Sequence, residues 1–183
     1  MYDRIQVLVG HDRVLERLSR EIAALRPKVV VDIGGGTGTV RNLLPDHCRY
    51  ICLDLEMPKL LGFRSKVFKG FAVLGDATSM PIVGGCADLV ICKSVTHHLT
   101  DTQLEAALNE SRRVLRPGGH MILFDAVLNK RRFAGRVLWR LDRGSYPRLE
   151  GDLHKKLQDK FKIIRWEKFA IYHEYVLGVG IRG

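Results

Sequence analysis

The segment VVVDIGGGTGTV, residues 29–40, constrains the fold of this chain more than any other feature. A β-branched run passes into a glycine-rich turn, and the residues after the turn are expected to start a helix. Glycines let the backbone come close to a ligand, and the first N–H groups of a helix are unpaired and can bind an anion. The segment therefore predicts a buried strand at 29–33 that leads into a nucleotide-type binding turn.

The spacing of the glycines separates one class of nucleotide from another. A dinucleotide fingerprint GxGxxG that starts at Gly34 needs glycines at positions 34, 36 and 39. Position 39 is Thr39, and the third glycine is Gly38 instead. The spacing disfavours a pyrophosphate site and an NAD-dependent dehydrogenase, although the glycine pattern taken alone fits a tight strand-to-helix turn equally well.

Strand and helix patterns alternate along the rest of the chain, which predicts an α/β fold with a mainly parallel sheet covered on both faces. The expected strands after the first are at 50–53, 71–74, 88–92, 120–124, 161–166 and 172–181. The expected helices are at 12–25, 101–115, 130–142 and 150–160. The last two strands are close enough in sequence to form an antiparallel pair, so we expect a doubly wound sheet of seven strands.

Composition limits the classes of function that fit this chain but does not identify one of them. The formal net charge is +10, which favours an acidic partner such as nucleic acid, an anionic membrane surface or an acidic substrate, or else reflects a solvated basic surface. The N-terminus lacks a signal-peptide pattern and no apolar run reaches the ~20 residues that span a bilayer, so we expect a cytoplasmic protein. The four cysteines lack metal-ligand spacing, and we expect reduced thiols and no metal site.

Carboxylates stand at or after three of the predicted strands. Asp32 lies in the first, Asp54 ends the second and Asp76 follows the third. The carboxyl ends of parallel strands meet at one crevice, where Asp54 can accept hydrogen bonds from both hydroxyls of a ribose. Asp76 would then lie near an adenine, whose exocyclic amine is a donor.

Four segments carry a resemblance to a known family: VVVDIGGGTG, ICLDLE, GDATSMPIVGGCADLVICKSVTHHL and RRVLRPGGHMILFDA. Over about residues 28–125 the chain resembles the class I methyltransferases that use S-adenosylmethionine, most closely the type 11 group that includes the ubiquinone/menaquinone biosynthesis C-methyltransferases. The resemblance implies a Rossmann-like fold and methyl transfer to a small-molecule acceptor. We expect 1–183 to form one domain, with a cofactor-binding part at 28–125 and substrate-side elements at 1–27 and 126–183.

The resemblance also implies which residues surround S-adenosylmethionine, taken in chain order from the methionine moiety through the ribose to the adenine and the fourth strand. These are Asp32, Gly34, Gly36, Thr37, Asp54, Leu55, Asp76, Ala77 and Lys93. Lys93 departs from the family, in which small or polar residues are commoner at this position. Its ammonium would lie beside the positively charged sulfonium of the cofactor.

Methyl transfer from a sulfonium depends on orientation, which can contribute ~7 to 11 kcal/mol, and a dedicated base is optional. Where the acceptor must lose a proton, two histidines just beyond the fourth strand titrate near neutral pH. We predict His98 as the catalytic residue. His97 and Asp125 are alternatives, and either histidine could instead cap the loop or pack on the sheet.

Two other functions stay open. The basic charge is typical of nucleic-acid enzymes, but CKSVTHHL lacks the Asn/Asp-Pro-Pro-aromatic motif that holds a flipped base, and Cys92 has no Pro-Cys context. The second is a non-catalytic partner subunit, which either binds the cofactor or has lost the ability to bind it. The intact carboxylates at positions 32, 54 and 76 argue against loss of the cofactor.

Residues 129–144 predict an amphipathic helix with arginines on one side and apolar residues on the other. The arginines are Arg132, Arg136, Arg140 and Arg143, with Trp139 at their border. Such a helix packs its apolar side on the sheet and exposes its basic one. Alternatively, it contacts an anionic membrane surface or guides an acidic or lipid-linked acceptor.

Overall fold

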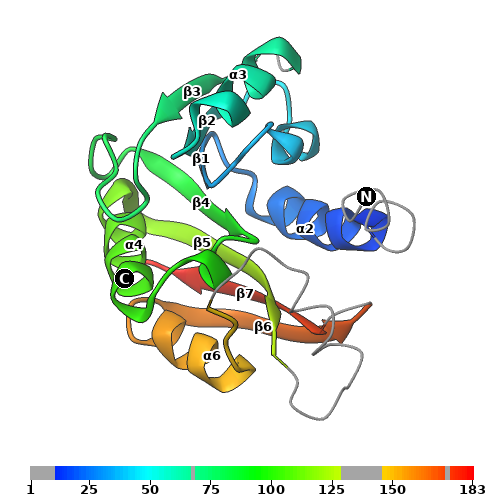
Figure 1. Cartoon of the computed structure of the whole chain (residues 1–183), viewed down its shortest axis with the longest axis vertical. Coiled ribbons are helices and arrows are strands. Elements are labelled where there is room, and N and C mark those ends of the chain that lie inside the picture. The colour runs from blue at the N-terminus through cyan, green and yellow to red at the C-terminus, as the bar shows by residue number, and fades with distance from the viewer. Residues whose placement is uncertain (1–10, 67–68, 129–145, 172–173) are drawn as a thin grey trace.

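The computed structural model describes residues 11–66, 69–128, 146–171 and 174–183, and a seven-stranded sheet runs through them (Figure 1). The strand order is β3-β2-β1-β4-β5-β7-β6. The strands are β1 (Val29–Ile33), β2 (Arg49–Asp54), β3 (Phe71–Leu74), β4 (Ala87–Lys93), β5 (Leu115–Val127), β6 (Lys162–Ala170) and β7 (Glu174–Ile181). The helices are α2 (His11–Leu25), η1 (Thr39–Leu43), α3 (Met57–Lys66), η2 (Thr96–His98), α4 (Asp101–Val114) and α6 (Glu150–Gln158).

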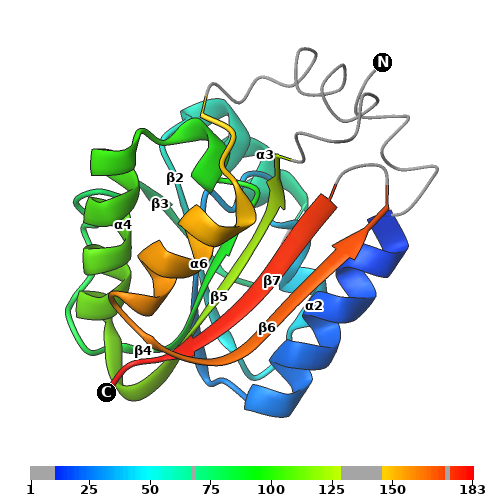
Figure 2. The same ribbon diagram turned by 90° about the horizontal axis from the view of Figure 1, so that it is seen from below.

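The predicted fold class is confirmed. Neighbouring strands from β3 to β5 pair in parallel, whereas β7 pairs antiparallel with both β5 and β6. Figure 2 shows α2 on one side of the sheet and α4 and α6 on the other. This is the doubly wound arrangement that alternating strands and helices predict.

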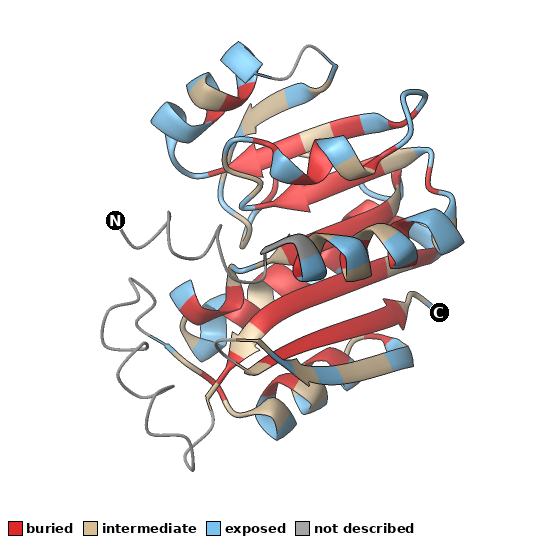
Figure 3. Cartoon of the chain, turned by 90° about the vertical axis from the view of Figure 1, so that its right-hand side faces the viewer, coloured by how far each residue is buried: buried red, intermediate tan, exposed pale blue. Residues whose placement is uncertain are grey.

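Two apolar layers hold the helices on the sheet. Residues of α2 and α3 pack on one face of the strands, and residues of α4 and α6 pack on the other. Since both faces are covered, the central strands are mostly apolar on both faces, as buried parallel strands require, and their buried carboxylates lie toward the strand ends. Figure 3 shows this buried interior along the central strands.

The helices begin and end where their sequences dictate. In α2, Val14, Leu18 and Ile22 recur every four residues and are buried on one stripe. At the start of α4 the Thr100 hydroxyl accepts from the backbone N–H of Gln103, whose side chain in turn accepts from the backbone N–H of Thr100. This capping box fixes the first turn of α4 directly after the loop that carries the histidines.

Two local predictions need correction. Instead of a regular helix after the glycine turn, the chain forms only the five-residue 3₁₀ helix η1, whose N-cap Gly38 has φ 79° and no side-chain cap, and Pro45 follows closely. The strand expected at 120–124 is longer: β5 starts at Leu115, directly after α4. Its first residues contain a left-handed Gly118 and lie opposite a register irregularity between Ala87 and Leu89.

Other predictions concern residues outside the ranges that the structure describes. The helix at 130–142, and with it the amphipathic segment 129–144, lies outside the described residues, as do positions 172–173 of the last predicted strand. Within the described ranges, no helix is long and apolar enough to cross a membrane. The four cysteines form no disulfide with one another.

Candidate active site

The glycine turn is shaped by its backbone. Gly34, Gly36 and Gly38 adopt φ values of 62°, 56° and 79°, a region that residues with a Cβ rarely enter. A Cβ at Gly34 would also lie 2.5 Å from Cγ2 of Val95. Glycine is therefore required at position 34 for both conformation and space, and the turn lies against the loop that follows β4.

Asp54 ends β2 and lies beside this turn. Its carboxylate accepts from the backbone N–H of Gly36 at 3.0 Å and from that of Glu56 at 2.9 Å, one bond to each oxygen. Each carboxylate oxygen can accept a second bond, so the group retains capacity for a ligand hydroxyl. The next residue, Leu55, is 69% exposed, which provides an apolar surface beside the carboxylate.

Asp32 in β1 is buried beneath the turn. The Tyr50 hydroxyl donates to its Oδ2 at 2.5 Å. Burial raises the pKa of Asp32 to about 7; the nearby charge of Asp54 adds to the rise, while the Tyr50 hydrogen bond and the charge of Lys93 oppose it. A carboxyl group in this state gains or loses its charge near neutral pH.

Tyr50 is a member of the site that the sequence analysis missed. It lies in β2 opposite Val30 of β1 and is fully buried, with the pKa of its hydroxyl raised by burial and by the carboxylate beside it. A tyrosine within a buried apolar strand requires a partner for its hydroxyl, and that is the signal that could have identified it.

Lys93 is the last residue of β4 and is half-buried. Burial lowers the pKa of its ammonium, whereas the charges of Asp32 and Asp125 raise it. The ammonium is therefore placed in the electrostatic field of two buried carboxylates at the strand ends.

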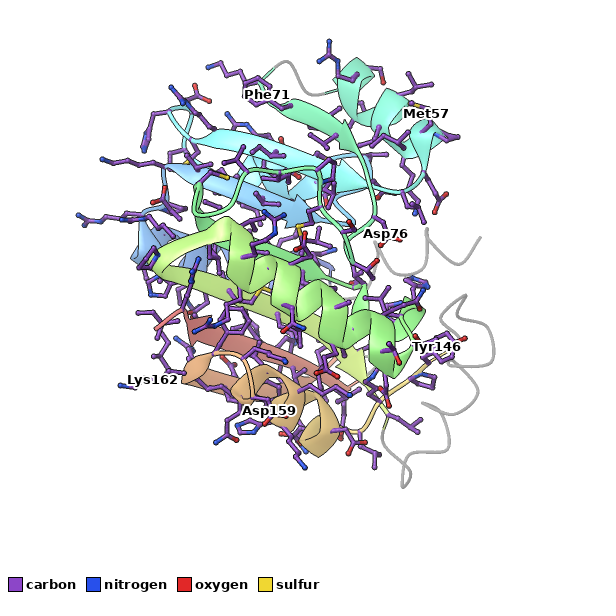
Figure 4. The ribbon with its side chains drawn as sticks, turned by 90° about the vertical axis from the view of Figure 1, so that its left-hand side faces the viewer. Met57, Phe71, Asp76, Tyr146, Asp159 and Lys162 are labelled. Atoms are coloured by element: carbon purple, nitrogen blue, oxygen red, sulfur yellow. The ribbon has the colours of Figure 1, made fainter. Side chains whose placement is uncertain are left out.

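Thr37, Asp76 and Ala77 complete the predicted set, with different surroundings. The Thr37 methyl lies toward α3, 3.2 Å from where a Cβ on Gly62 would be. Asp76 is exposed after β3 and accepts from both the N–H and the hydroxyl of Thr78 at 2.8 Å, and Ala77 packs on the core. In Figure 4 Asp76 lies on the side toward which the β1–β3 arrows point, where Tyr146 lies as well.

Asp125 of β5 anchors the turn η2 that follows β4. Its fully buried carboxylate accepts from the N–H and hydroxyl of Thr96 at 2.7 and 2.6 Å, from Nδ1 of His97 at 2.6 Å, and from the N–H of Ala126 at 2.8 Å. Burial acts to raise the pKa of Asp125, but these hydrogen bonds from His97, Thr96 and Ala126 outweigh it and hold the pKa below its usual value.

The two histidines of η2 have different environments. His97 is buried against Asp125, while His98 is exposed at the end of the turn. Their rings are 4.2 Å apart at 47°. The predicted catalytic residue His98 can therefore contact a ligand, and His97 corresponds to the alternative in which one histidine of the pair packs inward.

A hollow of about 880 Å³ lies beside this turn, between the start of α4 and α6. Thr100, Asp101, Tyr146 and Arg148 are among the residues that line it. None of the residues around the glycine turn contributes to it, so it is separate from the predicted cofactor site. In the part of the chain that the structure covers, no three His, Cys, Asp or Glu side chains gather as metal ligands.

Comparison with known proteins identifies one family. The family described as "Methyltransferase domain" matches residues 31–123. That range contains the glycine turn and the carboxylates at positions 32, 54 and 76, together with η2.

Three curated relatives carry different names. A malonyl-[acyl-carrier protein] O-methyltransferase of Coxiella burnetii is 33% identical over 119 residues, covering 63% of this chain and 39% of that protein. The ubiquinone/menaquinone biosynthesis C-methyltransferase UbiE of Shewanella frigidimarina is 29% identical, covering 63% and 50%. The tRNA (carboxymethyluridine(34)-5-O)-methyltransferase alkbh8 of Xenopus tropicalis is 33% identical, covering 52% and 15%. The chain thus spans half or less of the length of each.

A solved structure supports the fold. The magnesium protoporphyrin IX methyltransferase of Synechocystis with bound SAH superimposes with a TM-score of 0.75 at 20% identity, covering 95% of this chain and 84% of the other. The overlap extends through the C-terminal strands, beyond the residues that the family match covers.

Proposed function

The chain belongs to the methyltransferase domain family, and we propose that it transfers the methyl group of S-adenosylmethionine to the oxygen of an acidic small-molecule acceptor. The observation that carries the proposal is the Asp54 carboxylate, held against the glycine turn by the N–H of Gly36 with acceptor capacity to spare. A ribose with two neighbouring hydroxyls fits this carboxylate. The exposed Leu55 beside it fits the apolar face of an adenine.

The bound cofactor would supply an electrophilic methyl group on a sulfonium. Gly34 and Gly36 would allow the methionine moiety to approach the backbone, and Asp54 and Leu55 would hold the adenosine. These residues act by orientation, which can contribute ~7 to 11 kcal/mol to a displacement of this kind.

Charge supports an acidic acceptor. The formal net charge of the chain is +10. Lys93 also places an ammonium at the end of β4, where the family commonly has a small or polar residue. One relative is named as an O-methyltransferase of malonyl-[acyl-carrier protein], and a malonyl group bears a free carboxylate. A carboxylate acceptor would already be deprotonated at neutral pH, so methyl transfer to its oxygen would need no base from the protein.

His98 would contact the acceptor from the exposed end of η2. Toward a carboxylate it would donate a hydrogen bond, and toward a hydroxyl or an activated carbon it would remove the proton. Substitution of His98 by asparagine is expected to raise the acceptor KM at least tenfold and to leave the affinity for S-adenosylhomocysteine within twofold of the unsubstituted protein.

A nucleic-acid acceptor is the second candidate, favoured by the same charge and by the relative named as a tRNA methyltransferase. The segment 129–144, with the four arginines that the sequence predicts on its basic side, would serve either acceptor by contacting phosphates or an anionic membrane surface. Co-sedimentation with anionic and zwitterionic vesicles, before and after changing Arg132, Arg136 and Arg140 to glutamine, tests the membrane contact. Equal, negligible sedimentation with both vesicle types would exclude it.

The test is methyl transfer from S-adenosylmethionine labelled in its methyl group. Purified protein is incubated with separate small-acid, acyl-carrier, quinone and tRNA fractions, and the labelled product is treated with mild alkali. An oxygen ester releases labelled methanol, whereas a methyl on carbon stays in the product. Alkali-labile label in an acidic fraction is expected. Stable label in the quinone fraction, or label confined to tRNA, would contradict the proposed acceptor, and no transfer into any fraction would favour a non-catalytic partner subunit.

A further inference from the structure

A buried arginine holds the outer side of η2. Arg148 lies just before α6, and its side chain is only 8% exposed. Its guanidinium donates to the carbonyls of Thr96 and of Leu99, the latter at 2.6 Å, and pairs with Oδ1 of Asp101 at 3.0 Å. The two carbonyls stand on either side of the histidine pair, so one side chain spans the whole turn.

Backbone hydrogen bonds of the residues around Arg148 also connect this segment to η2. The Tyr146 N–H donates to the carbonyl of His97 at 2.9 Å, and the Leu128 N–H donates to the carbonyl of Arg148 at 2.7 Å. Residues 146–148 are therefore bound to η2 on one side and to the end of β5 on the other. We call this segment the 146–148 clamp.

The turn is consequently held from two directions. Asp125 binds Thr96 and His97 from the sheet, while the 146–148 clamp binds the carbonyls of the same two residues and of Leu99. Among the residues that the structure describes, none of the hydrogen bonds of Arg148 involves the glycine turn or Asp54. Arg148 can therefore affect the histidines without touching the residues around the predicted cofactor.

The contact depends on the shape of arginine. A planar guanidinium with five N–H donors can serve two carbonyls and a carboxylate at once, whereas a lysine ammonium is a point charge at the end of a flexible stem. Asp101 is 73% exposed, so the ion pair alone contributes little, and the buried bonds to the carbonyls carry the restraint.

We propose that Arg148 is a positioning residue that fixes η2, and with it His98, for contact with the methyl acceptor. The inference rests on the proposed role of His98. Arg148 itself contacts neither cofactor nor acceptor in this account. Its effect passes through the orientation of the turn.

The test compares Arg148→Lys with the control Arg165→Lys. Arg165 lies on β6, is 44% exposed, and pairs with Glu21 of α2 and with Glu167 of its own strand. The first readout needs no acceptor: exchange of the His97 Nδ1 proton with solvent, followed by NMR. We expect Arg148→Lys to accelerate this exchange at least tenfold and Arg165→Lys to leave it unchanged. S-adenosylhomocysteine affinity is expected to stay within twofold in both.

The second readout is turnover. Arg148→Lys is expected to lower kcat/KM for the acceptor at least tenfold while KM for S-adenosylmethionine stays within twofold. Arg148→Gln serves if Arg148→Lys does not fold, because its neutral amide leaves no buried charge and can donate to only one of the two sites that the guanidinium joins, and a change of at least twofold in the same direction is expected.

Unchanged proton exchange in Arg148→Lys, or a loss of cofactor affinity parallel to the loss of turnover, would overturn the positioning role. If Arg148→Gln is the variant used, unchanged proton exchange and unchanged turnover would overturn it as well. Absence of methyl transfer by the unsubstituted protein would overturn the proposed function instead, and the proton-exchange comparison would still be readable.

Discussion

Replacing Asp32 by asparagine is predicted to stabilise the protein at pH 8. Asp32 is 1% exposed, and burial raises its pKa from 3.8 to about 7. The folded state therefore holds the proton more tightly than the unfolded state does. The stability that this group contributes is fully present below pH 3.8 and is lost as the pH rises toward 7.

The size of the effect follows from the shift. A rise of roughly three pKa units corresponds to about 4 kcal/mol, at 1.36 kcal/mol for each unit. Asparagine removes this cost but weakens the hydrogen bond from Tyr50, which is worth about 1 to 2 kcal/mol. The net gain at pH 8 is about 2 to 3 kcal/mol, or about 4 to 12 °C in Tm for a chain of this size.

The assay is urea unfolding followed by circular dichroism at pH 4, 6 and 8. The difference between Asp32→Asn and the unsubstituted protein should grow with pH and level off near 7. Asp46→Asn is the control, because Asp46 is fully solvated and its pKa is lowered by the hydrogen bond from Lys69. Its difference should be small and opposite in sign. A pH-independent difference for Asp32→Asn would refute the reasoning.

Three further substitutions probe the site. Asp54→Ala is expected to cost about 1.5 to 3 kcal/mol of S-adenosylhomocysteine affinity by calorimetry with the fold intact; unchanged affinity would move the ribose site elsewhere. His97→Phe keeps a ring but removes the donor to Asp125, and urea unfolding should show a loss of about 1.5 to 3 kcal/mol at neutral pH. That loss should shrink in acid as the carboxylate is protonated, and a loss as large at pH 3 as at pH 7 would contradict it. Gly34→Ala should lower Tm because of its contact with Val95, and adding Val95→Ala should restore part of the loss, since φ 62° stays strained; full restoration would show that strain contributes nothing.

Much of the fold follows from local patterns in the sequence. Short β-branched runs and helical spacing each depend on neighbouring residues, and they predicted the seven strands, the mainly parallel sheet and the antiparallel C-terminal pair. The position of β7 between β5 and β6 was not predicted. The extent of η1 did not follow, because the glycine turn favours a helix start while Gly38 without a side-chain cap and the nearby Pro45 limit it to one short turn.

The part of the candidate site that lies at the carboxyl ends of neighbouring strands could be predicted from the sequence. Asp32, Gly34, Gly36 and Asp54 meet because parallel strands end at one edge. The hydrogen bonds that hold these side chains and η2 in place join positions far apart in the sequence. Tyr50 of β2 donates to Asp32 of the neighbouring strand β1, and Arg148 donates to a turn about 50 residues earlier. The spacing of apolar residues along the sequence does not predict which distant residues form hydrogen bonds.

The central claim is that this chain holds an adenosyl cofactor at the glycine turn without a pyrophosphate site. Isothermal titration calorimetry with S-adenosylhomocysteine and, separately, with NAD tests it directly. S-adenosylhomocysteine is expected to bind at one site per chain, and NAD is expected to give no heat beyond dilution. Binding of NAD with no binding of S-adenosylhomocysteine would contradict it.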